Sequence, residues 1–160
     1  MKKDKMLFVR IAADIENELE NVRKVKSDFL EFRGAYPIID RFLLRALASF
    51  LEDFYNACEK VFKIIAEELN GGVPKGENWH KTLLNEMATR IGKRPAVLSP
   101  ELTQTLVAFL GFRHIVRHVY GFILDASKVE DLAVIFPKTA DRFCAEIGRF
   151  TKNMKQSDAH

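Results

Sequence analysis

The sequence has few cysteines and no long uninterrupted run of apolar residues. Its two cysteines, Cys58 and Cys144, lie far apart. Each sits within an apolar helical pattern, which favours buried free thiols over a disulfide. The apolar run at residues 6–9 ends at Arg10 and is too short for the core of a signal peptide, and no later run could span a bilayer. We therefore expect a cytoplasmic protein with reduced thiols.

Strand-like alternation of apolar and polar residues is also missing, as are internal repeats, low-complexity segments and domain linkers. At 160 residues, with 48% hydrophobic and 29% charged residues, the chain has the composition of one globular domain. We expect a single all-α domain over residues 1–160, a bundle of about five helices with a short disordered C-terminal tail from about residue 152.

Helical periodicity, caps and breakers place these helices. Gly34 and Pro37 end the first, Asn70-Gly71-Gly72 ends the second, and Ser99 with Pro100 opens the fourth. The pattern Ser127-Lys128-Val129-Glu130 is typical of a capping box that opens the fifth, which Pro137 should interrupt. The expected helices are approximately residues 5–33, 37–69, 79–91 and 100–125, and a fifth from 127 onward.

Acidic residues are missing from residues 102–124, the stretch that contains RHIVRHVY at positions 113–120. A solvated helix usually mixes charges, because acid–base pairs four residues apart stabilise it. Residues 80–125 together carry six Lys or Arg against three Asp or Glu. This local excess suits a polyanionic partner.

An ideal helix would place the polar side chains of this stretch on one arc: Arg113, Arg117, His114, His118 and Tyr120, around Gly121. Arg113 and His118 would still be about 140° apart, which is wide for one small site. Two arrangements could bring them together. One is a bend at Gly111, and the other is a two-fold dimer packed around Gly121.

Arg113, four intervening residues, His118, one more residue and Tyr120 resemble the R-x4-H-x-Y signature of HEPN-domain RNases, specifically the HepT toxins of HEPN–nucleotidyltransferase toxin–antitoxin pairs. The similarity extends over nearly the whole chain. Its other landmarks are Phe54-Tyr55-Asn56, Glu59, Trp79, Leu83-Leu84, Arg94-Pro95 and Phe112-Arg113-His114. Many HEPN proteins have Asn after the motif arginine, so the role of His114 is open.

The resemblance implies a HEPN-like bundle that forms a two-fold homodimer and cleaves RNA, with tRNA as the expected class. It implies the toxin of a type VII-like toxin–antitoxin pair that needs no metal or other cofactor. A minimal nucleotidyltransferase antitoxin would silence the toxin by transferring AMP to the motif tyrosine, here Tyr120. The implied catalytic residues are Arg113 and His118.

These residue types suit RNA cleavage. A neutral imidazole, here His118, can take the proton of the 2′-hydroxyl, and a second, protonated imidazole, from the other chain of a dimer, can supply the leaving oxygen. Arg113 can grip the phosphate and stabilise its transition state. The residues expected to bind RNA around them are Arg117, His114, Arg94, Lys93 and Arg90.

Two other interpretations remain open. His114, His118 and Asp125 fall on one helical face and could bind a metal ion, although Arg113 and Arg117 would crowd a cation. The chain could also be a catalytically idle HEPN-like module that binds a partner nucleotidyltransferase or a nucleotide.

Overall fold

The computed structural model describes residues 2–157, which form five α-helices and one 3₁₀ turn. Their bounds are α1 (Lys2–Ala35), α2 (Arg41–Leu69), α3 (Trp79–Met87), α4 (Pro100–His118), η1 (Gly121–Ile123) and α5 (Ala126–Ser157). Extended pairing in these residues is limited to an isolated bridge between Ile91 and Arg94. The all-α prediction is confirmed. None of the helices in residues 2–157 is both long and apolar enough to cross a membrane.

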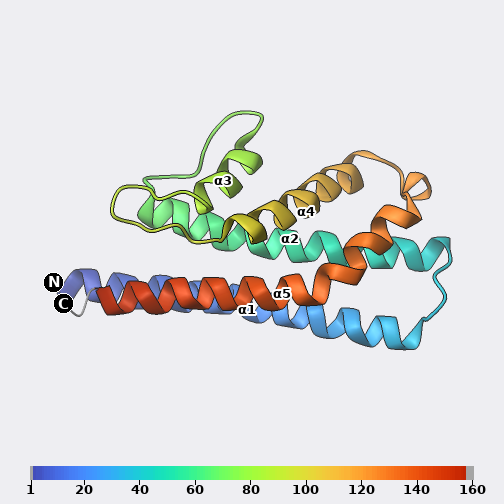
Figure 1. Ribbon diagram of the computed structural model, residues 1–160, viewed down its shortest axis with the longest axis horizontal. Helices are drawn as coiled ribbons and strands as arrows, with labels where there is room; N and C mark the ends of the chain where they lie inside the picture. The colour runs from blue at the N-terminus through green and yellow to red at the C-terminus, as the bar shows by residue number, and fades with distance from the viewer. Residues whose placement is uncertain (1, 158–160) are drawn as a thin grey trace.

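Helix α2 is the centre of the bundle, because it packs against α1, α3, α4 and α5. Figure 1 shows α1 and α5 side by side on one side of α2, with α3 and α4 on the other. Phe54 of α2 is fully buried and lies edge-on to Phe109 of α4, Phe136 and Phe143 of α5, with ring centroids 5.2, 5.0 and 6.2 Å away. These aromatic contacts join three helices in one core.

The long helices begin and end at the signals that their sequences carry. Asp40 caps α2, because its carboxylate accepts from the backbone N–H groups of Phe42 and Leu43. The helix therefore begins at Arg41 rather than at Pro37. Gly71 and Gly72 have φ values of 84° and 140° and end it, as predicted.

Ser99 caps α4 as predicted. Its hydroxyl accepts from the N–H of Leu102, and Glu146 of α5 accepts from the Ser99 N–H at 2.6 Å. Before it, α3 ends at Met87 rather than near residue 91, because the Met87 carbonyl accepts from the N–H groups of Val97 and Leu98. These bonds fold the connecting loop back onto the end of α3.

Helix α4 ends at His118, so the expectation of one helix to residue 125 is wrong. Val119 and Tyr120 adopt extended backbone conformations, and the turn η1 follows. The segment from Val119 to Ile123 combines glycine with β-branched and aromatic residues, all of which have low helix propensity. Tyr120 and Gly121 are therefore not on the helix that carries Arg113.

The start of α5 also differs from the prediction. Asp125 accepts from the N–H groups of Ser127 and Lys128, at 3.0 and 3.4 Å. Asp125, and not Ser127 as predicted, therefore caps the start of α5. Pro137 lies inside α5 and does not divide it. Figure 1 shows α5 changing direction in its orange part, and a helical proline is a usual cause of such bends.

The C-terminal part of the chain is more ordered than expected. Helix α5 continues to Ser157, where a disordered tail from about residue 152 was predicted. Met154 packs against the core, and this apolar contact explains the extra helical turn. Residues 158–160, the rest of the expected tail, lie outside the described residues. Cys58 and Cys144 are both free thiols, Cys58 buried and Cys144 half-buried.

Candidate functional site

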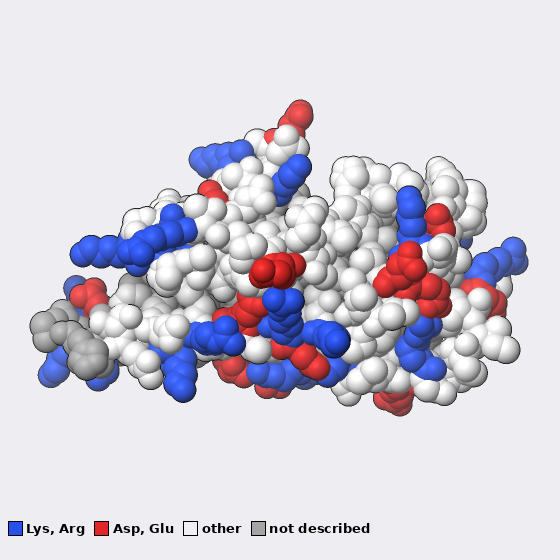
Figure 2. Space-filling model, viewed as in Figure 1, with Lys and Arg blue, Asp and Glu red and all other residues white. Residues whose placement is uncertain are grey.

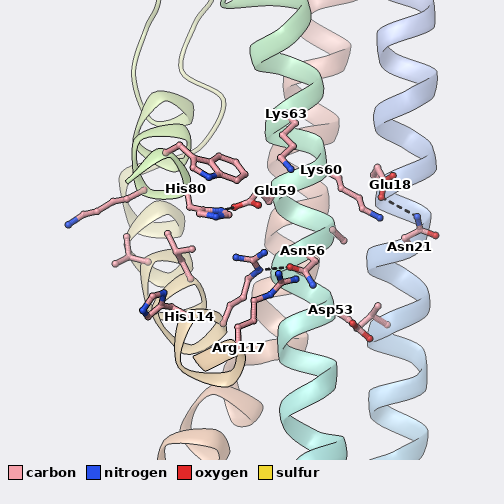
Figure 3. Close-up of a pocket in the computed structure, with 18 of the residues that line it drawn as sticks. Glu18, Asn21, Asp53, Asn56, Glu59, Lys60, Lys63, His80, His114 and Arg117 are labelled. Carbon is pink, nitrogen blue, oxygen red and sulfur yellow. Dashed lines mark hydrogen bonds and ion pairs between the residues drawn. The ribbon is translucent and has the colours of Figure 1, made fainter. Parts of the chain in front are cut away.

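A cleft of about 1190 Å³ lies between α1, α2 and the pair of helices α3 and α4. Figure 3 shows α2 in its middle, with α1 on one side and the other two helices opposite. The predicted pair Arg113 and His118 both line it. The other basic or imidazole side chains of its wall are Lys24, Lys60, Lys63, Lys81, Arg117, His80 and His114.

One face of α2 orients the side chains of the opposite wall. The residues of this face are Glu52, Asn56, Glu59 and Lys63, and they recur every three or four positions, the spacing of one helical stripe. Each of the four contacts one side chain of α3 or α4. In the same order, the partners are Arg117, Arg113, His80 and Trp79.

Arg113 is the buried cation of the cleft, with 8% of its surface exposed. Its Nε donates to Oδ1 of Asn56 at 2.5 Å, a bond to a neutral group that leaves the guanidinium charge uncompensated. Within residues 2–157, neither terminal nitrogen of Arg113 has a hydrogen-bond partner. A guanidinium fixed by Nε, with both terminal NH2 groups free, is suited to bidentate contact with a phosphate.

His118 lies at the last residue of α4, with an exposed side chain. Its Nδ1 is 2.7 Å from the backbone oxygen of His114. A carbonyl oxygen only accepts, so Nδ1 must carry a proton and the neutral ring keeps its lone pair on Nε2. The His114 ring stacks on His118 with centroids 4.3 Å apart. These contacts leave Nε2 of His118 available as a base.

Two arrangements were proposed to bring Arg113 and His118 together, a bend at Gly111 and a dimer around Gly121. A single chain places both residues in one cleft without either of them. Helix α4 runs through Gly111 without a break. Gly121 lies in η1, where an added Cβ would be 2.7 Å from Nε of Arg45, so a side chain of the same chain covers it. Both side chains line the cleft despite the wide angle expected between them around α4, because the cleft is large and His118 is the last residue of the helix.

His80 and Glu59 form a second polar pair in the cleft. Nδ1 of His80 lies 2.6 Å from Oε2 of Glu59, whose side chain is only 5% exposed. Trp79 stacks on the His80 ring with centroids 3.6 Å apart, and Nζ of Lys63 lies 4.8 Å from the Trp79 centroid. The imidazole is thus held by a buried carboxylate and by an aromatic face.

Acidic side chains share the cleft with these basic groups. Asp53 and Glu59 are among those that line it. Glu52 is outside the lining and accepts from Nε of Arg117, a cleft residue, at 3.0 Å. Burial, with a smaller effect from the charge of Glu52, raises the pKa of Asp53. On the face of the molecule in Figure 2, Lys and Arg are mixed with Asp and Glu and form no separate basic patch. Arg113 differs from the other cations of the cleft because it is buried and its terminal nitrogens have no hydrogen-bond partner among residues 2–157.

Three residues predicted to bind RNA lie outside the cleft, in the connection between α3 and α4. Arg90 and Lys93 are exposed, and neither lines the cleft. Arg94 is 8% exposed and donates to Asn70 Oδ1 and to the carbonyl oxygens of Pro95 and Glu86, at 2.7, 2.7 and 3.0 Å. Burial lowers the pKa of Arg94. The guanidinium of Arg94 therefore holds the loop together, and contact of Arg94 with RNA stays a prediction.

Tyr120 is 72% exposed and stands in the connection after α4, two residues beyond His118. It does not line the cleft. Its ring stacks on that of Phe122, with centroids 5.4 Å apart. The phenol is therefore accessible to another protein, close to the cleft along the chain.

The alternative metal site is not assembled. Asp125 caps α5, and the two other proposed ligands, His114 and His118, lie on α4. Within residues 2–157, no group of three or more His, Cys, Asp or Glu side chains is placed to hold a metal ion.

Sequence reasoning assigned no role to Asn56, Glu59 or His80, which shape the cleft. One signal was present: Asn56 and Glu59 are polar residues next to buried apolar residues of α2, such as Tyr55, Ala57 and Cys58. Polar groups in buried positions need partners. Their partners, however, lie 57 and 21 residues away along the chain.

A family model described as HepT-like protein matches residues 46–154, which is more than half of the chain. The matched span begins within α2 and includes all of α3 and α4 and most of α5. It therefore contains every cleft residue except those of α1. No curated protein and no solved structure matches the chain.

Proposed function

Because the chain belongs to the HepT-like protein family, we propose that it is the endoribonuclease toxin of a toxin–antitoxin pair and cleaves RNA without a metal ion. One observation carries the catalytic part of this proposal. The free guanidinium edges of Arg113 and the free Nε2 of His118 belong to the same cleft. A phosphate clamp and a base are the two groups that attack by a 2′-hydroxyl requires.

In the proposed reaction, Arg113 holds the scissile phosphate through its terminal nitrogens, and Asn56 fixes the guanidinium from behind. Nε2 of His118 takes the proton of the adjacent 2′-hydroxyl, whose oxygen attacks the phosphorus. Arg113 stabilises the charge that develops on the phosphoryl oxygens. The leaving 5′ oxygen needs a proton from a second acid, and His118 of the partner subunit in a homodimer is one candidate.

Neighbouring groups complete the RNA site. Arg117 reaches the cleft from the turn after Arg113, and its bond to Glu52 is at the surface, where exchange for a phosphate costs little. His114 stacks on His118 and positions it. Arg90 and Lys93 lie outside the cleft and at most contact more distant phosphates. We propose RNA, with tRNA as the expected class, as the substrate.

Exposed apolar residues support a homodimer. They lie at the end of α4 and in the connection after it: Ile115, Tyr120, Phe122 and Ile123, with 43, 72, 73 and 58% exposure. Large apolar residues gathered on a surface mark a site of protein contact. Since this surface adjoins His118, a two-fold contact there would bring two clefts together.

Tyr120 is the proposed AMP acceptor for a partner nucleotidyltransferase. Its exposure gives a second protein access to the hydroxyl. The added phosphodiester would carry negative charge two residues beyond His118, which lines the cleft, and the adenosine would add bulk there. Modification would thus hinder RNA without unfolding the bundle, because Tyr120 is outside the core.

The proposal is tested by incubating purified protein with a tRNA pool and excess chelator, beside the Arg113→Ala and His118→Ala variants. The wild type should cleave, and loss of the phosphate clamp should lower the rate by roughly 10²–10³-fold. Wild-type activity that disappears with chelator contradicts the mechanism, as does full activity in both variants. A wild type that binds a nucleotidyltransferase but cleaves no RNA would favour the idle module instead.

A further inference from the structure

His80 adds to the cleft an imidazole from outside α4, which supplies His114 and His118. It comes from α3, whereas His118 and Arg113 come from α4. All three line the same cleft. The His80 side chain is 29% exposed, so it can reach a molecule bound there.

The setting of His80 differs from that of an ordinary surface histidine. Its partner Glu59 is buried in α2, where a carboxylate without a partner would be strongly unfavourable. Among residues 2–157, His80 is the hydrogen-bond partner of this carboxylate. The carboxylate accepts from Nδ1–H of His80, so the neutral ring has no proton on Nε2. In the imidazolium form, whose positive charge faces the carboxylate, Nε2–H is a donor directed away from Glu59.

The position of the pair relative to Arg113 follows from α2. Asn56, which holds Arg113, and Glu59, which holds His80, are three residues apart on one helical face. Three residues correspond to a rise of about 4.5 Å. Figure 3 shows Asn56 and Glu59 as neighbours along α2, with His80 across from Glu59. A phosphate on the free edge of Arg113 would therefore lie within one helical turn of the His80 layer.

Accepting the proposed ribonuclease function, we propose that His80 is the general acid of the reaction, acting in the same chain as Arg113 and His118. As the 2′ oxygen bonds to phosphorus, its proton passes to Nε2 of His118. The bond from phosphorus to the 5′ oxygen breaks, and that oxygen takes the proton from Nε2 of His80. The products are a 2′,3′-cyclic phosphate and a 5′-hydroxyl. One proton has moved from His80 to His118, and solvent restores both rings.

Glu59 is a positioning residue in this scheme, and Trp79 supports the ring from its face. The competing explanation is that the pair only joins α2 to α3. The two explanations differ in one respect. A general acid matters only when the leaving group needs a proton, whereas a structural pair matters for every substrate.

The test compares two RNA oligonucleotides that contain a site mapped with the wild type. One has the normal 5′ oxygen at this site, and the other has sulfur in its place. A thiolate leaves without protonation, so the sulfur substrate does not need the acid. The variant is His80→Asn, whose side-chain amide can still donate to Glu59 where Nδ1 did but has no acidic N–H beyond it. Thermal unfolding checks that this variant folds.

The His80→Asn variant should cleave the normal substrate at least about 100-fold more slowly than the wild type and the sulfur substrate at nearly the wild-type rate. His118→Ala should be slow on both, because both need the base. Equal losses on both substrates in His80→Asn, no loss on either, or a variant that fails to fold despite keeping the bond to Glu59 would overturn the role of His80. If the wild type cleaves no RNA, so that no site can be mapped, the ribonuclease proposal itself is overturned.

Discussion

Arg113 and Asn56 are joined by a 2.5 Å hydrogen bond across the cleft, from the guanidinium Nε to the amide oxygen. This bond comes from a neutral partner, so it orients the arginine without neutralising it. An acidic partner in the same place would compete with a bound phosphate. In this pair Asn56 orients the guanidinium, and Arg113 is the proposed phosphate-binding group.

The first prediction concerns this bond. Asn56→Ala should lower RNA cleavage by roughly 10–100-fold, because an arginine displaced by about 1 Å no longer matches the transition state. Asn56→Asp keeps the acceptor but adds a negative charge, so it should weaken RNA binding as well. Asn153→Ala, an exposed change near the end of α5, serves as the control. Unchanged cleavage by Asn56→Ala would show that Arg113 does not depend on this bond.

The second prediction compares the contributions of Arg94 and its neighbour Lys93 to the stability of the fold. Arg94→Ala removes a donor from three acceptors, so the free energy of unfolding should fall by about 2–4 kcal/mol. Lys93→Ala, at an exposed position, should change stability by less than about 0.5 kcal/mol. Urea unfolding of both variants measures the difference. Equal stability of the two would refute the structural role of Arg94.

The third prediction concerns assembly. Phe122→Asp should convert a wild-type dimer into a monomer in sedimentation velocity, because it places a charge in the exposed apolar surface beside α4. Val134→Asp is the matched control, since Val134 is equally exposed at 73% but lies on α5. A wild-type monomer that is fully active, or a Phe122→Asp dimer, would count against the proposed interface.

The fourth prediction concerns regulation. Incubation with the partner nucleotidyltransferase and ATP should add AMP to the wild type and silence it. Tyr120→Phe keeps the ring but removes the acceptor oxygen, so mass spectrometry should find no adduct and cleavage should persist. If Tyr120→Phe is silenced as completely as the wild type, modification of this residue is not the switch.

Sequence patterns predicted the helices well where the signals are local. The glycines that end α2 and the Ser99 cap of α4 each depend on residues within a few positions of one another. The end of α4 was missed because an apolar periodicity continues past the point where the backbone becomes extended. Pro137 was misread as an interruption, although surrounding contacts keep α5 helical on both sides of it.

The site was predictable only in part. The spacing of Arg113 and His118 singled out both residues, and the structure places both in one cleft. Their orientation depends on Asn56 and on the backbone of His114, and the first of these contacts spans 57 residues. Whether a basic residue is exposed or buried also depends on such contacts, which is why the sequence did not show that Arg94 is buried.

The chemistry of the cleavage products tests the central claim most directly, that this cleft cleaves RNA by means of the RNA's own 2′-hydroxyl. Wild-type protein in excess chelator is given an RNA with a mapped cleavage site and the same RNA with a single 2′-deoxy nucleotide on the 5′ side of that site. We predict a 2′,3′-cyclic phosphate and a 5′-hydroxyl from the first and no cleavage at the site in the second. Cleavage of the deoxy substrate, or products with a 5′-phosphate, would contradict the mechanism.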